Sequence, residues 1–511
     1  MHRWKKIVLA CFALLLIMAV ALNWYMRTYD EREPSRVGFS GHCADCHGQA
    51  LEGTRLGPAL TGRALAHGDS TSDLIASIAE RHDGNGSADW KVTLSGPMIK
   101  ALALYVSEQR QRIPTIVESQ VHSLPEDVVR SDYHDFQVEL VTRLHSPPYA
   151  IAPLPDGRVL VSEKVRGLSV VDREGQQGPL LDGAPRAWKE FIQARGSYVG
   201  IGMMLDVQLH PEYLENGWIY LSHSDRSQLD CGSLWPVSMV RVIRGRLEDN
   251  RWVDTQVIWS VHKDYYTVVP DGVAAGRLAF DDQGHLFVTV GGKAPYSNLH
   301  KLDTPYGKIH RVRDDGSIPQ DNPFWQPPGS RAASSTRHTV WSYGHRSTQG
   351  LTSRPGTGAI WAAEMGPRGG DEINLIQRGG NYGWPLYTNG LDYDGEPVTI
   401  GEDLGLTFPE SATIPPVVDF TPAPAISNLT FHDGDLFPDW EDDLLVGSLR
   451  ARTLYRLRIR DGQLLELEKL LHNLGRIRDV EMGFDGLVYL LLEHTGGGSL
   501  IRLRPVAASG Q

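Results

Sequence analysis

The chain has 511 residues, enough for about two to four domains and a large buried core. Its formal net charge of −12 argues against a nucleic-acid-binding surface. Charged residues make up 22% and hydrophobic residues 41% of the chain, which is ordinary for a globular protein.

The N-terminus combines a basic start, MHRWKK, with the apolar run Ile7–Leu22. Trp24 and Tyr25 follow at the position of interfacial aromatic residues, and with them the run approaches the ~20 residues that a bilayer requires. We therefore expect residues 1–26 to be an uncleaved anchor in the bacterial inner membrane, with the bulk of the chain in the periplasm. A cleaved signal peptide ending at Ala19-Val20-Ala21 is the alternative.

The most specific short motif of the chain is Cys43-Ala44-Asp45-Cys46-His47. This C-x-x-C-H spacing is typical of c-type haem attachment, in which two thioether links hold the haem and the histidine ligates iron. A redox dithiol or half of a zinc site is the haem-free interpretation. The adjacent histidine and the export signal favour haem c, bound through Cys43 and Cys46, with His47 as the iron ligand.

Apolar residues recur with helical spacing in Leu74–Ile78 and Met98–Val106. Helices flanking a haem motif resemble a small class I cytochrome c, so we expect a small all-α cytochrome c domain at residues 37–112. Residues 113–136 contain scattered prolines and acidic residues and are expected to be a linker.

The sequence indicates the fifth iron ligand of the expected haem more clearly than the sixth. Leu56–Leu60 resembles the cytochrome segment whose proline carbonyl accepts a hydrogen bond from the ligating histidine, which here implies Pro58. In that family the sixth ligand is usually a methionine in the loop before the last helix, but His82–Trp90 contains none. Met98 and His82 are the candidates, and the choice between them leaves the haem potential open.

From residue 137 onward the pattern changes to short apolar runs behind tight turns. Six such turn–strand units recur, at 156–161, 216–221, 283–288, 357–362, 441–446 and 485–490. A repeated turn–strand unit with long insertions is the signature of a β-propeller with one unit per blade. We therefore predict a mainly β six-bladed propeller over residues 137–507.

Several longer motifs identify a family resemblance that covers residues 140–505. They are Asp315–Pro323, Val340–Gly350, Glu364–Leu375, Gly379–Pro385 and Gly475–Val480. These segments resemble the soluble PQQ-dependent glucose/aldose sugar dehydrogenases. The resemblance implies a six-bladed propeller that uses PQQ and calcium, and members with a fused cytochrome c unit are known.

The resemblance also implies where the cofactor binds. PQQ carries three carboxylates, which guanidinium groups match well. The cationic positions of the family fall on Arg346, Arg450, Arg476 and Arg478, and the backbone carbonyls that bind calcium fall on Gly366 and Pro367.

The catalytic positions match poorly. The histidine that serves as general base in the family falls on Val273, which cannot accept a proton. An acidic residue of the family falls on Gly292, and a polar one falls on Ile201. The asparagine that follows the first arginine is Ser347, and His262 is the weak candidate for a substitute base.

These features predict a membrane-anchored periplasmic quinohaemoprotein. It would oxidise an aldose sugar or alcohol with PQQ and pass electrons through haem c to a respiratory-chain acceptor. The alternative is a degenerate, non-catalytic propeller that serves as a binding module tethered to an electron-transfer cytochrome c.

Overall fold

A computed structural model of the chain describes residues 33–81, 94–114, 123–188, 191–194, 197–227, 236–271, 274–292, 295–327, 335–494 and 496–506. The chain forms two compact units, Met1–Ile116 with Leu391–Pro397, and Val117–Gly390 with Val398–Gln511. The predicted anchor at residues 1–26 lies outside the described residues. None of the described helices combines the length and apolar character needed to cross a bilayer.

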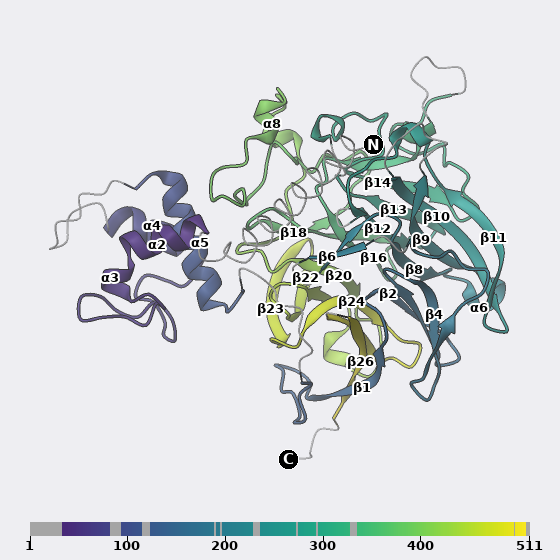
Figure 1. Ribbon diagram of the computed structural model, residues 1–511, viewed down its shortest axis with the longest axis horizontal. Coiled ribbons are helices and arrows are strands. Elements are labelled where there is room, and N and C mark those ends of the chain that lie inside the picture. Colours follow the sequence, from purple (N-terminus) through teal and green to yellow (C-terminus); the bar gives the residue numbers. More distant parts are fainter. Residues whose placement is uncertain are drawn as a thin grey trace, which may run out of the picture. The chain divides into compact units, whose positions relative to one another are not determined.

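The smaller unit is helical. It contains α2 (Pro34–His42), α3 (Ala44–His47), α4 (Thr71–Arg81) and α5 (Gly96–Arg110), coloured purple to blue in Figure 1. The helices predicted around 74–78 and 98–106 are therefore confirmed as α4 and α5. One apolar cluster joins α2, α4 and α5 through residues such as Phe39, Leu74 and Leu102. Burial of these side chains stabilises a unit too small to rely on backbone propensity alone.

The larger unit contains six four-stranded antiparallel sheets. Blade 1 is β2 (Pro148–Pro153), β3 (Val159–Glu163), β4 (Gly167–Val171) and β5 (Gln177–Leu180). Blade 2 is β8 (Met204–Leu209), β9 (Ile219–Ser227), β10 (Val237–Glu248) and β11 (Arg251–Trp259). Blade 3 is β12 (Ala275–Phe280), β13 (His285–Val290), β14 (Lys308–Arg313) and β15 (Val340–Tyr343).

The remaining blades follow the same order. Blade 4 is β16 (Thr348–Arg354), β17 (Ala359–Glu364), β18 (Asp371–Leu375) and β19 (Val418–Phe420). Blade 5 is β20 (Ile426–Phe431), β21 (Leu444–Ser448), β22 (Leu454–Arg460) and β23 (Gln463–Leu471). Blade 6 is β24 (Arg476–Met482), β25 (Val488–His494), β26 (Gly497–Pro505) and β1 (Phe136–Leu144).

Short elements fill the connections between the strands. They are the hairpin β6 (Phe191–Ala194) and β7 (Ser197–Gly200), the helices α6 (Tyr213–Asn216), α7 (Ser335–Thr339) and α8 (Ile400–Asp403), and the 3₁₀ turns η3 (Lys263–Tyr265), η5 (Tyr296–Asn298), η6 (Glu410–Ala412) and η7 (Pro438–Trp440).

The first strands of the blades form a closed inner ring. β2, β8, β12, β16, β20 and β24 each contact the next in this order, and β24 contacts β2. Hydrogen bonds between the two ends of the propeller chain close the ring, because β1 pairs with β26 as the outermost strand of blade 6. The six predicted turn–strand units are the second strands of the six blades, β3, β9, β13, β17, β21 and β25. The six-bladed propeller predicted from the sequence is thus confirmed.

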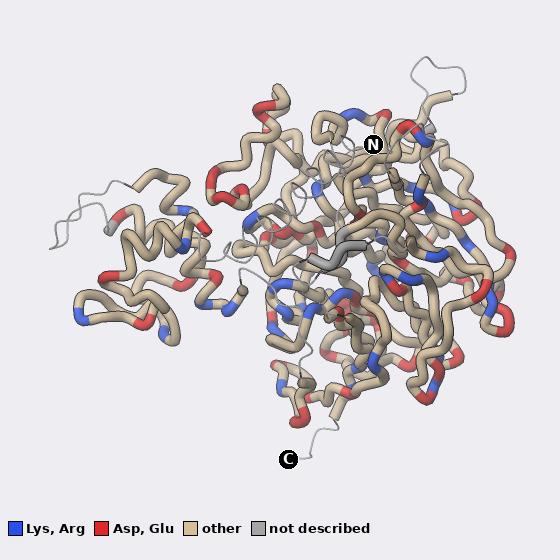
Figure 2. The backbone as a smooth tube through the Cα atoms, in the orientation of Figure 1, with Lys and Arg blue, Asp and Glu red and all other residues tan. Residues whose placement is uncertain are grey.

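Burial differs between the inner and the outer strands of the blades. β3 and β12 are buried at every position, because both faces of each blade pack against neighbouring blades. The outer strand β23 instead alternates between exposed and half-buried residues over most of its length. Acidic and basic residues are interspersed along the backbone of the chain (Figure 2), as expected for a chain with a modest negative net charge.

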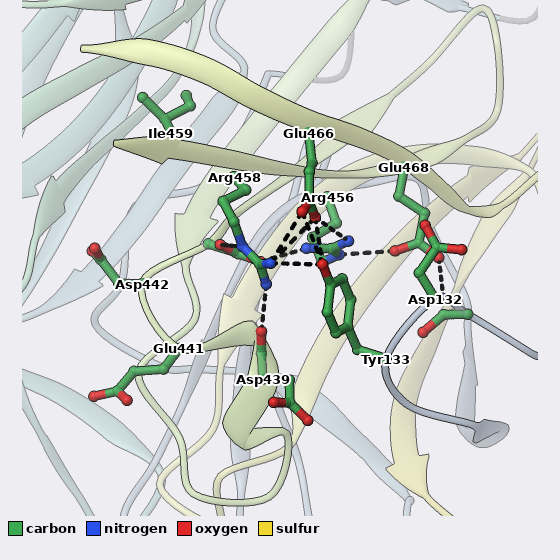
Figure 3. Close-up of polar contacts among 12 residues, drawn as sticks. Asp132, Tyr133, Asp439, Glu441, Asp442, Arg456, Arg458, Ile459, Glu466 and Glu468 are labelled. Atoms are coloured by element: carbon green, nitrogen blue, oxygen red, sulfur yellow. Dashed lines mark hydrogen bonds and ion pairs between the residues drawn. The ribbon is translucent and has the colours of Figure 1, made fainter. Parts of the chain in front are cut away.

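The segment before β1 is fastened to blade 5 by a charged cluster (Figure 3). The Tyr133 ring lies 4.6 Å from the Arg456 guanidinium and 4.5 Å from that of Arg458, and its hydroxyl donates to Glu466 at 2.8 Å. Beneath it, the fully buried Asp443 accepts from Arg456 at 2.5 Å and from Arg458 at 3.0 Å. Asp443 is therefore the buried anion that holds these cations together.

Replacing Asp443 with asparagine is expected to lower the free energy of unfolding of the propeller by up to about 3 kcal/mol, because Arg456 would lose its fully buried partner and keep only Glu468 and Glu466. The matched control Glu466→Gln removes a carboxylate that is 40% exposed, and should cost less than about 1 kcal/mol. Denaturant unfolding followed by tryptophan fluorescence measures both. Equal losses would show that Asp443 is not the buried anchor of the cluster.

Candidate functional site

The propeller brings the predicted cofactor residues to one end of the inner ring. In each antiparallel blade the start of the first strand lies beside the end of the second, as in the pairs Thr348↔Glu364 and Arg476↔Glu493. We call this end the top face. The four predicted arginines belong to it by their position on the strands: Arg346 precedes β16, Arg450 follows β21, and Arg476 and Arg478 begin β24. Gly366 and Pro367 follow β17 on the same face.

Two of the arginines converge on one carboxylate. Glu493, at the end of β25, accepts from the Arg478 Nε at 2.8 Å, and the Arg476 Nη2 lies 3.9 Å from the same carboxylate. A third cation joins them, because the Lys164 Nζ lies 2.6 Å from the other Glu493 oxygen. Although burial opposes it, Arg478, Lys164 and Arg476 hold the pKa of Glu493 well below its ordinary range.

The other two arginines lie around Asp371. Arg346 donates to the Met365 carbonyl at 3.0 Å and lies 5.3 Å from the Trp384 ring, while Arg450 donates to the Ala423 carbonyl at 3.2 Å. Burial raises the pKa of Asp371 to about 7, and its hydrogen bonds and the two arginines oppose that rise. Arg346 and Arg450 are thus held near one buried acid rather than projecting as surface residues.

The turn that contains Gly366 and Pro367 is rich in backbone carbonyls. Asp371 fixes it by accepting from the Gly366 N–H at 2.9 Å. A Cβ on Gly366 would lie 2.2 Å from the Gly370 carbonyl oxygen, so only glycine fits this close approach. Calcium takes oxygen ligands of this kind. The described part of the chain has no group of three or more His, Cys, Asp or Glu side chains suited to a metal, so calcium binding here through carbonyls stays a prediction.

Sequence reasoning missed the carboxylates that position these arginines. Glu364, at the end of β17, accepts from the backbone N–H of Arg346 and bonds the His345 Nδ1 at 2.8 Å. His345 is itself held by the Ser342 hydroxyl at 2.8 Å. Their position along the predicted strands is a signal that could have identified these carboxylates and Lys164. The six second strands are predicted from the sequence, and each of Glu364, Glu493 and Lys164 lies at or directly after the end of one of them.

The centre of the ring is occupied by a buried ion network. Arg277 on β12 contacts Asp206 at 3.1 Å and Asp479 at 2.8 Å. The same guanidinium donates to the backbone carbonyl of Arg478 at 2.9 Å, so it also holds one of the predicted cofactor residues in place.

The catalytic candidates are not brought together in the same way. Val273 lies outside the described residues. His262 is an exposed residue, 73% accessible, whose ring lies 3.2 Å from Asp264 in the same turn. Gly292 follows β13, Ile201 precedes β8, and Ser347 is buried and accepts from Gln349 at 3.0 Å. The described part of the propeller therefore contains a cation-rich top face but no assigned general base.

The helical unit contains a cavity of about 360 Å³ lined mainly by apolar side chains. Cys43 and His47 lie in its wall, and Cys43 and Cys46 are free thiols at the start and within α3. The predicted hydrogen bond is confirmed: the His47 Nδ1 lies 2.8 Å from the Pro58 carbonyl oxygen. Burial and Cys46 raise the pKa of the Cys43 thiol to about 11, the opposite of what a reactive redox dithiol requires.

The sixth-ligand candidates are less well placed. His82 lies outside the described residues. Met98 lies on α5, and its sulfur packs against α2, 3.2 Å from where a Cβ on Gly38 would stand. Met98 is not among the residues that line the cavity, whereas His42 and His67 are. Iron ligation by Met98 or His82 stays a prediction.

Comparisons with known proteins bear on the propeller. The family model described as Glucose / Sorbosone dehydrogenase matches residues 145–502. The chain is 34% identical over 371 residues to the aldose sugar dehydrogenase YliI of Escherichia coli, which covers 72% of this chain and 92% of that protein. A crystal structure of the soluble aldose sugar dehydrogenase from Escherichia coli in the apo-form is 30% identical, with a TM-score of 0.62 over 73% of this chain and 100% of that chain. A crystal structure titled glucose dehydrogenase is 32% identical, with a TM-score of 0.63 over the same shares.

Substitution of Arg277 by methionine is expected to lower the free energy of unfolding by about 3–5 kcal/mol, because Asp206 and Asp479 would be left as buried, unpaired acids. Neutralising both acids in the Arg277→Met/Asp206→Asn/Asp479→Asn variant should recover a large part of that loss. Denaturant titration of the three proteins measures the recovery. If the triple variant is no more stable than Arg277→Met, uncompensated charge is not the cause.

Proposed function

The chain belongs to the glucose/sorbosone dehydrogenase family, and from this premise we propose that its propeller binds PQQ with calcium and oxidises an aldose sugar or a related alcohol. The observation that carries the proposal is the cation-rich top face, where the buried Lys164 and Arg478 and the half-buried Arg476 share the single carboxylate of Glu493. Two relatives, an aldose sugar dehydrogenase and a quinoprotein glucose dehydrogenase, point to the same substrate class.

The residues of the top face fit a flat, polyanionic cofactor. Arg476 and Arg478 would bind carboxylate at the edge formed by β24, and Arg346 and Arg450 would do so near blades 4 and 5. The Nε of Arg476 is buried and has no hydrogen-bond partner among the described residues, as expected for a donor that serves a ligand. The carbonyl-rich turn at Gly366 and Pro367 would hold the calcium ion. Bound PQQ supplies a two-electron acceptor for the substrate.

Proton removal from the substrate hydroxyl needs a base at the top face. The family position for that base is Val273, and His262 is exposed in a turn of its own. The absence of a base at Val273, together with Gly292 and Ile201, motivates the second candidate function, a non-catalytic propeller that serves as a binding module. The two candidates make opposite predictions about PQQ binding.

We further propose that the helical unit carries haem c and receives the electrons. Cys43 and Cys46 would form the thioether links, and His47 would ligate iron with its tautomer set by the Pro58 carbonyl. The apolar cavity beside them supports this assignment, because haem binds in apolar pockets that exclude water. A respiratory-chain acceptor at the inner membrane, with the protein anchored on its periplasmic side, completes the proposed electron path.

Titration of the purified full chain with PQQ in the presence of calcium should quench tryptophan fluorescence, because Trp384 lies 5.3 Å from the Arg346 guanidinium. The loaded protein should then reduce an artificial acceptor with at least one of a panel of aldoses and alcohols. Arg478→Met should weaken PQQ binding about 10- to 100-fold by removing a charge-assisted hydrogen bond.

The outcomes of this titration separate the two candidate functions. Binding without turnover on any substrate would contradict the dehydrogenase activity. Failure to bind PQQ at all would contradict the proposal and favour the non-catalytic module.

Production of the full chain in cells that mature c-type cytochromes should give one covalently attached haem, which resists extraction with acidified acetone. A Cys43→Ala/Cys46→Ala variant should lose that haem, because neither thiol remains to bond the vinyl groups. Pyridine haemochrome spectra measure both proteins. A folded, haem-free wild type would exclude the cytochrome assignment.

A further inference from the structure

Lys164 occupies a position on the top face that the family resemblance did not assign. It directly follows β3 of blade 1, just as Met365 directly follows β17 of blade 4. Its side chain is only 5% exposed, and its Nζ lies 2.6 Å from Glu493, a residue of blade 6. The inner ring brings these two blades together, since β2 contacts β24.

The charges around Lys164 do not balance. One carboxylate, Glu493, faces the ammonium of Lys164 and the guanidinium groups of Arg476 and Arg478. A buried charge is costly unless it is paired, and one carboxylate pairs only one of these three cations. The surplus of positive charge and the unpartnered Arg476 Nε both call for an anion at this place.

We propose that Lys164 is a further anion-binding residue of the top face, and that it binds a carboxylate of the cofactor together with Arg476 and Arg478. This inference rests on the proposed PQQ function and extends it to blade 1. Lys164 acts as a point charge with three donors, so one N–H can remain on Glu493 while another turns to the ligand.

The surroundings of Lys164 give the interaction a pH signature. Burial lowers its pKa to about 7, Arg478 and Arg476 add to this, and Glu493 opposes it. The Tyr149 ring also faces it, 5.9 Å from the Nζ. In the ligand-free protein Lys164 is thus partly deprotonated slightly above pH 7. A bound carboxylate favours the ammonium form, so binding should raise its pKa and take up a proton.

Isothermal titration calorimetry of the full chain with PQQ and calcium, run at pH 7.5 in two buffers of different ionisation enthalpy, measures that uptake. The wild type should take up roughly half to three quarters of a proton on binding, because about a quarter of Lys164 is already protonated at this pH. Lys164→Arg should bind without this uptake, because arginine stays charged. Lys164→Met should bind about 10- to 100-fold more weakly. The control Arg158→Met removes a cation from the β2–β3 turn, at the opposite end of blade 1, and should bind like the wild type.

The possible results separate the role of Lys164 from the proposed binding of PQQ. Unchanged affinity in a folded Lys164→Met variant, or proton uptake that persists in Lys164→Arg, would overturn the role of Lys164 while leaving PQQ binding intact. Absence of PQQ binding in the wild type would instead overturn the proposed function itself. If denaturant unfolding shows that Lys164→Met does not fold, the proton count of the Lys164→Arg variant decides alone.

Discussion

The buried guanidinium of Arg277 is the interaction on which the propeller site depends. From β12 in blade 3 it bonds Asp206 on β8, the Gln349 carbonyl on β16, and both Asp479 and the Arg478 carbonyl on β24. Blades 3 and 6 are three steps apart in a ring of six, so these bonds cross the centre of the ring. One side chain therefore fixes the register of four inner strands and the backbone of a predicted cofactor residue.

The acids of this central network are distinct from the carboxylates of the top face. Asp206, Asp479 and Glu481 surround one arginine, and burial raises the pKa of Glu481 well above its ordinary value, with Asp479 and Asp206 adding to it. Asn428 donates a hydrogen bond to the same carboxyl group at 3.0 Å. The central acids pair with Arg277, so the cations near Glu493 have that one carboxylate as their close partner among the described residues. An anion supplied from outside the chain would balance the remaining positive charge there.

The sequence predicted the parts of this arrangement that depend on local pattern. The second strands of all six blades and the helices α4 and α5 follow from spacing and short motifs, and the hydrogen bond from His47 to Pro58 follows from the resemblance to cytochrome c. The pairing of Lys164 with Glu493 does not, because 329 residues separate the two and only ring closure brings blade 1 against blade 6. The role of Glu364 was missed for a related reason: its position at the end of a predicted strand does not reveal that it accepts from the backbone N–H of Arg346.

The predicted cofactor residues also serve the fold, which changes what their presence implies. Arg478 forms a buried ion pair with Glu493, and the backbone of Arg346 is held by Glu364. Loss of the Arg478 side chain would remove one cation from the buried Glu493, at a cost of about 3–5 kcal/mol, so stability alone favours Arg478 even in a chain that has lost its chemistry. A general base need not pair with a buried charge, and Val273 stands in this chain at the position where the family has its base. The unpartnered Nε of Arg476 therefore argues for a bound anion more directly than the presence of the arginines does, whereas catalysis requires a proton acceptor from a part of the top face other than the family position.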